Sequence, residues 1–340
     1  MLNVQLSEHA WLQASLPVSV GGLGVRTATQ IALPAFLSSV IGSADLCLRM
    51  LPSHLQKSAG LQDVNFIAAC EQWKTLTPVA PPFDARQKCW DLPLVAATSA
   101  VLLSTAPNQA AVARLTAVSA PHAGAFLHAI PMTSVGTRMD DQSLRIAIAT
   151  RLGAPVCAEH RCVCGAVVDT SGTHGLSCRK SAGRIARHNA VNELIRRALL
   201  TAEIPSRLEP AKLSHTDDKR PDGVLTMPWS RGQCLAWDFT CPDTLAASHL
   251  NRAVTGPGQV GNDAEQRKKE KYSALSTQYQ FVPIAIETLG PVGDEATAFF
   301  QDVGRRIIAV TREPRTMTFL WQQLSVAVQR GNAACVLGTD

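Results

Sequence analysis

The chain has 340 residues, of which 46% are hydrophobic and 17% charged, so it is not a disordered tail and we expect two or three domains with buried cores. The formal net charge of +5 is too small to identify a nucleic-acid partner by itself. No uninterrupted apolar run reaches the roughly 18 residues that a transmembrane helix needs, and no basic segment precedes an apolar one at the N-terminus. We therefore expect an intracellular protein without a membrane partner.

The N-terminal half is predicted to be α-helical. Glycines in residues 16–26 indicate a turn before a helix, and the absence of a surrounding βαβ pattern argues against a dinucleotide-binding loop. Beyond this run, apolar residues recur at helical spacing between proline-bearing breaks, which predicts helices at roughly 28–41, 84–104, 107–118 and 141–152. Asp140 or Asp141 is expected to cap the last of these helices.

Cysteine and histidine residues gather between positions 157 and 178. Four of them follow a C-x-C-x9-H-x3-C order and would supply one closed, structural Zn²⁺ site: Cys162, Cys164, His174 and Cys178. The spacing is close to that of a zinc knuckle, and Cys157 or His160 could replace one of the four. The alternative interpretation is a group of buried free thiols.

A basic segment follows the cysteines. Between Arg179 and Arg197 six lysine and arginine residues stand against a single acid, Glu193. Such a segment could place a positive helix face on phosphates, although a solvated helix face would have the same composition.

Two acidic residues and a lysine-bearing segment come next. Asp222 stands at the entry to a short apolar strand, and Asp238 interrupts a second strand that reads as buried. Carboxylates on neighbouring strands can form a divalent-metal site for Mg²⁺ or Mn²⁺. The segment 263–272 has helical spacing that brings Lys268, Lys271 and Tyr272 to one face, and residues 281–288 read as another strand. The alternation of strands and helices predicts a mixed α/β domain.

This order of a helix, two acid-bearing strands, a lysine-bearing helix and a strand resembles the PD-(D/E)xK nuclease superfamily. Threonine at position 240 departs from the pattern, because a lysine usually stands there. More closely, residues 157–280 resemble the endonuclease domain of site-specific non-LTR retrotransposons that insert into ribosomal RNA genes. The matching features are the Cys/His knuckle, Gly183 to His188, Glu209-Pro210, Arg220-Pro221-Asp222, Asp238, and Asp263 to Tyr272.

The resemblance implies a set of roles. Asp222 and Asp238 would bind Mg²⁺ or Mn²⁺, Lys268 would activate water with Lys271 as the second choice, and Glu193 would support them. The zinc knuckle would position the DNA. The residues that would contact nucleic acid are Arg184, Arg187, His188 and Arg220. Expected partners are target DNA, the element's RNA and a polymerase domain normally in the same protein; the expected location is the nucleus, with the cytoplasm during synthesis.

The predicted organisation has five segments. Residues 1–26 would be the remnant of a post-thumb segment, 27–152 an α-helical linker domain, 153–180 the zinc knuckle, 181–312 the restriction-enzyme-like nuclease with a mixed sheet, and 313–340 a C-terminal helix and frayed tail. Two alternatives to an active endonuclease stay open. One is a catalytically inactive or domesticated DNA- or RNA-binding module, which Thr240 and the missing polymerase favour, and the other is a fragment without selected activity.

Overall fold

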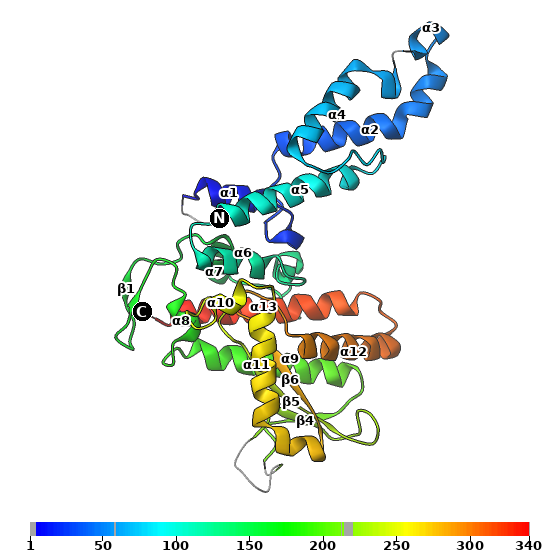
Figure 1. Cartoon of the computed structure of the whole chain (residues 1–340). Helices are drawn as coiled ribbons and strands as arrows, with labels where there is room; N and C mark the ends of the chain where they lie inside the picture. Colours follow the sequence, from blue (N-terminus) through cyan, green and yellow to red (C-terminus); the bar gives the residue numbers. More distant parts are fainter. Residues whose placement is uncertain (1–4, 58, 212, 214–219, 340) are drawn as a thin grey trace. The chain divides into compact units, whose positions relative to one another are not determined.

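The computed structural model describes residues 5–57, 59–211, 213 and 220–339 (Figure 1). The chain forms two compact units, one of residues Trp11–Ala106 and one of Met1–Ala10 with Pro107–Asp340. Helix α1 (Glu8–Ser15) crosses the boundary between them. Helices precede a mixed sheet, which confirms the predicted α+β class.

The unit Trp11–Ala106 is helical. Its main helices are α2 (Ala28–Met50), α4 (Val64–Leu76) and α5 (Gln87–Ser104), with the single turns η1 (Val18–Val20), α3 (Ser53–Gln56) and η2 (Gly60–Gln62). The side chains of Leu37, Phe66, Trp73 and Trp90 form its core. Trp73 and Trp90 pack edge to face at 5.4 Å, and the Trp73 indole donates a 3.0 Å hydrogen bond to the Trp90 carbonyl. The helix predicted at 28–41 is longer than expected and continues to Met50. Helix α4 was not predicted.

Among the described residues, α2 is the one helix long and apolar enough to cross a membrane. Its most apolar window has a mean hydropathy of 1.7, and 22% of that window is buried. Serine and glutamine interrupt its apolar runs, so it contains no long uninterrupted apolar segment. Core helices of soluble proteins meet the same criteria of length and composition, so this is weak evidence for a membrane.

The second unit begins with helices that lead to a small hairpin. These are α6 (Gln109–Val118), η3 (Ala125–His128) and α7 (Asp141–Leu152), followed by strands β1 (His160–Arg161) and β2 (Val167–Val168), helix α8 (His174–Ser177) and helix α9 (Gly183–Thr201). Asp140 caps α7, as predicted, because its Oδ1 accepts a 2.8 Å hydrogen bond from the Ser143 amide.

A four-stranded mixed sheet follows. Its strands are β3 (Ser206–Leu208), β4 (Gly223–Leu225), β5 (Leu235–Thr240) and β6 (Gln280–Ala285), hydrogen-bonded in that order. The pairs β3/β4 and β4/β5 are antiparallel, whereas β5 and β6 are parallel. A parallel pair needs a crossover connection. Here α10 (Leu250–Ala253), α11 (Gln259–Lys271) and η4 (Ser273–Thr277) provide it.

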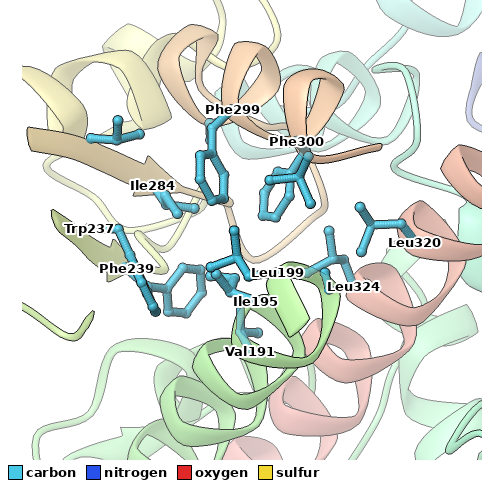
Figure 2. Packing of buried hydrophobic residues seen from close by; sticks show 14 of the residues in the cluster. Val191, Ile195, Leu199, Trp237, Phe239, Ile284, Phe299, Phe300, Leu320 and Leu324 are labelled. Atoms are coloured by element: carbon cyan, nitrogen blue, oxygen red, sulfur yellow. The ribbon is translucent and has the colours of Figure 1, made fainter. Parts of the chain in front are cut away.

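The two faces of the sheet have different partners. Trp237, Phe239 and Ile284 pack into the main core with α9, α12 (Asp294–Thr311) and α13 (Thr316–Leu337), as Figure 2 shows. Because side chains alternate along a strand, Asp238 points away from this core and meets residues of α11 instead. The apolar side chains of β5 thus face α9, α12 and α13, whereas Asp238 faces α11.

The C-terminal helix differs from the prediction. The expected end near residue 329 with a frayed tail is wrong, because α13 continues to Leu337 and buries Cys335 and Val336. Glycines allow the close approach: a Cβ added to Gly183 of α9 would lie 2.5 Å from the Cys335 nitrogen. The C-terminal residues are thus part of the packing around α8 and α9.

We expect the substitution Phe300→Ala to destabilise the second unit by about 3–5 kcal/mol, because it empties a fully buried position in the main core. Urea unfolding would measure the free energy. Ile185→Ala is the control, since the Ile185 side chain is 69% exposed. Equal losses in the two variants would contradict this account of the core.

Candidate functional site

The four predicted zinc ligands come together in the structure. Their ligand atoms all lie within 4.8 Å of one another: Cys162, Cys164, His174 and Cys178. The sulfur atoms of Cys162 and Cys178 are 3.8 Å apart, and Cys164 Sγ is 3.2 Å from His174 Nε2. Zinc–sulfur bonds of about 2.3 Å in a tetrahedron place two sulfurs about 3.8 Å apart. The cluster can therefore bind a metal such as zinc.

Short local structures deliver these ligands. The β1–β2 hairpin turns through Gly165, whose φ of 90° belongs to the left-handed region that glycine tolerates, and Cys162 and Cys164 flank the start of this turn. The Ala166 backbone amide, together with neighbouring polar side chains, lowers the pKa of the Cys164 thiol to about 7. Helix α8 begins at His174, and the Cys178 amide donates to the His174 carbonyl. A lowered thiol pKa favours the thiolate that binds metal.

The two alternative ligands are not part of the group of four ligand atoms. Cys157 Sγ lies 3.3 Å from the Asp169 carbonyl, and the His160 ring contacts the Ala158 carbonyl and the Thr339 hydroxyl at 2.9 and 3.0 Å. The cluster thus consists of the quartet first chosen, and His160 links the hairpin to the C-terminal end of the chain.

We expect the purified chain to contain about one zinc per molecule and Cys164→Ser to lose most of it, because a closed site needs all four donors. Metal content would be measured by mass spectrometry. Cys157→Ser is the matched control and should retain the metal. Loss of zinc from the control alone would show that the quartet has been assigned wrongly.

A second polar site forms where β4 meets β5. Gly223 pairs with Trp237 and Val224 with Ala236, so extending the register by one residue sets Asp222 opposite Asp238. Gly223 is required here, since a Cβ at this position would lie 2.1 Å from the Trp237 ring. The two acids that the sequence places 16 positions apart are thus neighbours across the sheet.

Residues of α9 and β5 hold the Asp222 carboxylate. Its Oδ2 atom accepts hydrogen bonds from the Phe239 amide at 2.7 Å and from His188 Nε2 at 2.9 Å. Burial opposes the charge of Asp222, but the bonds from His188, Phe239 and Asn192 outweigh it and lower the pKa of this carboxyl. The same contact with Asp222 raises the pKa of His188. Asp222 is therefore ionised at neutral pH.

Helix α11 and the residue that follows it hold the Asp238 carboxylate. The Tyr272 hydroxyl donates to Asp238 Oδ1 at 2.6 Å and lies 2.8 Å from the Arg220 carbonyl, and the Lys268 ammonium forms an ion pair with Asp238 Oδ2. The Asp238 side chain is only 4% exposed and that of Lys268 is 25% exposed. A buried carboxylate needs such partners, because an unpaired charge is costly away from water.

The other predicted groups on this side are less closely engaged. Lys271 lies beside the site, with its ammonium 3.0 Å from the Tyr272 hydroxyl rather than on a carboxylate. Arg220 is exposed, and its guanidinium lies 3.8 Å from Glu209. Of the two lysines, Lys268 is thus the one in contact with an acid of the pair.

Two predicted residues of α9 have other surroundings. Glu193 pairs with Arg196 and Arg197, which lower the pKa of Glu193 to about 2, and it lies five residues beyond His188, about 140° around the helix. Arg184 is exposed and reaches the carbonyls of Ser177 and Cys178.

Arg187 requires a correction. It is only 3% exposed and its guanidinium donates to Asn332 Oδ1 at 2.5 Å, so the prediction that it contacts phosphate is wrong. The side chain crosses over Gly331 of α13, where a Cβ would lie 2.4 Å from Arg187 Cβ. Arg187 therefore joins α9 to α13 in the interior.

Sequence reasoning missed one residue of the site. Asn192 on α9 receives a 3.0 Å hydrogen bond from the Trp237 indole, and its amide nitrogen lies 3.3 Å from His188 Nδ1. An available signal was that His188 and Asn192 are four residues apart, which sets them on one helix face.

Comparison with protein-family models and with curated proteins finds no match for this chain.

Proposed function

We propose that the chain is a metal-dependent endonuclease module of the PD-(D/E)xK type, similar to that of non-LTR retrotransposons, which hydrolyses phosphodiester bonds in target DNA. The observation that carries the proposal is the convergence of Asp222, Asp238 and Lys268 from two adjacent strands and a crossover helix. The element order α9, β4, β5, α11 and β6 is the order of helix, acid strands, lysine helix and strand that suggested this superfamily.

The donor atoms fit a hard divalent cation. Mg²⁺ and Mn²⁺ prefer oxygen ligands, and the two carboxylates supply them. The buried Asp238 Oδ2 is in contact with the Lys268 ammonium, so a bound cation would share this oxygen with the lysine. Asp222 and Asp238 would hold the metal, which would neutralise charge on the scissile phosphate and lower the pKa of a bound water.

The chain's own residues would complete the site. Lys268 contacts the oxygen of Asp238 from α11, so its ammonium is placed to orient a water molecule or a phosphate oxygen beside the acids. Thr240 lies two residues beyond Asp238 and therefore on the same side of β5. This arrangement supports the interpretation that a lysine of the crossover helix takes the role usually given to the lysine at the threonine position.

A second candidate is a nucleic-acid-binding module without catalysis. The same Lys268–Asp238 ion pair favours it, because a salt bridge can stabilise the buried acid without any metal. The zinc cluster and the exposed Arg184 beside it would then supply the binding surface. A nuclear location and the element's RNA as a partner are proposed for both candidates.

We expect the full chain to nick supercoiled plasmid with Mg²⁺ or Mn²⁺, and Asp222→Ala, Asp238→Ala and Lys268→Ala each to lower the rate about 100-fold or more. Gel electrophoresis would follow nicking, and a gel shift would follow DNA binding. Lys269→Ala is the matched control, since this neighbouring lysine pairs with Glu295 at 2.6 Å. DNA binding without nicking by the unsubstituted chain would favour the inactive binding module.

A further inference from the structure

A chain of side-chain hydrogen bonds leads from the core to Asp222. The Trp237 indole nitrogen donates to Asn192 Oδ1 at 3.0 Å, Asn192 Nδ2 lies 3.3 Å from His188 Nδ1, and His188 Nε2 lies 2.9 Å from Asp222 Oδ2. Trp237 is fully buried and Asn192 is 5% exposed, whereas His188 is partly exposed. One end of the chain is therefore fixed in the core and the other reaches the acidic site.

The donor-only character of the indole sets the direction of every bond in this chain. Because the Trp237 N–H can only donate, Asn192 must present its oxygen to it and its NH₂ group to the imidazole. His188 Nδ1 must then accept, so that the proton of the neutral ring sits on Nε2 and is donated to Asp222. Buried amides and rings with such partners have one orientation and one tautomer.

We infer that Trp237, Asn192 and His188 act as positioning residues that fix the Nε2–H tautomer of His188 and thereby orient the Asp222 carboxylate for metal. This inference rests on the proposed nuclease function. Oδ2 of Asp222 accepts from His188 and from the Phe239 amide, so these two donors fix the orientation of the carboxylate. Groups that orient a metal-binding side chain in this way typically change metal affinity or activity about 10- to 100-fold when removed.

Nitrogen NMR of the full, zinc-loaded chain with ¹⁵N-labelled histidine tests the tautomer directly. Spectra taken at about pH 9, well above the ordinary imidazole pKa of about 6.5, should show His188 protonated at Nε2 alone. The signal is assigned by its absence from His188→Gln. A ring protonated at Nδ1, or an equal mixture of tautomers, would overturn the inference.

Two substitutions are expected to change the tautomer of His188. Asn192→Asp keeps the shape and the acceptor for Trp237 but removes the donor to Nδ1, so we expect a proton on His188 Nδ1. Trp237→Phe removes the indole N–H and keeps an aromatic ring, so we expect mixed tautomers and nicking lowered about 10-fold with DNA binding unchanged. Trp229→Phe is the control, because Trp229 stacks on Arg306 away from Asn192.

Catalytic rescue separates positioning from packing. His188→Gln retains an N–H that can reach Asp222 and should nick within about 3-fold of the unsubstituted chain, whereas His188→Leu should lose about 10-fold or more. Equal activity of the two variants would overturn the inference. Absence of nicking in the unsubstituted chain, with the Nε2–H tautomer observed, would overturn the nuclease function alone, and nicking with mixed tautomers would overturn the positioning role alone.

Discussion

Burial of the Asp238 carboxylate is the constraint on which the arrangement of the second unit depends. A charge in the middle of a buried strand is tolerated only with close partners, and here they are the Lys268 ammonium and the Tyr272 hydroxyl. Both come from the crossover between β5 and β6, so the segment that allows the parallel pairing also supplies the partners of the acid. The position of α11 over the sheet brings Lys268 to the buried acid.

The opposite face of β5 packs in the apolar core and also positions donors to Asp222. Trp237 and Phe239 enter the core with α9, α12 and α13, while their backbone and side-chain donors hold Asp222: the Phe239 amide directly and the Trp237 indole through Asn192. Dense packing fixes these donors in place. Core residues and site residues therefore alternate along this strand, so a change in the packing of one set would also move the other.

Local patterns in the sequence predicted the parts of the site that depend on residue type and spacing. The zinc quartet, the two acid-bearing strands and the lysine face of α11 all have short-range signatures. Contacts between distant helices were not predictable: Arg187 read as a surface arginine, yet it is buried because Gly331 of α13 leaves room for it. Asn192 was missed for a similar reason, because its partner Trp237 comes from β5, 45 positions further along the chain. The C-terminal end looked frayed because its apolar residues gain their burial from segments far away in the sequence, among them α8 and α9.

Helix α9 connects the zinc cluster to the acidic site. Cys178 is followed by a tight turn in which the Ser181 amide donates to the Cys178 carbonyl, and Arg184 reaches back to the same carbonyl. His188 then lies about one turn beyond Arg184 on the same face of the helix, directed at Asp222. Metal bound by the quartet would fix the start of α9 and hence the register in which His188 meets the acid. A structural zinc site can thus control the geometry of a second site through one helix, without contributing any ligand to it.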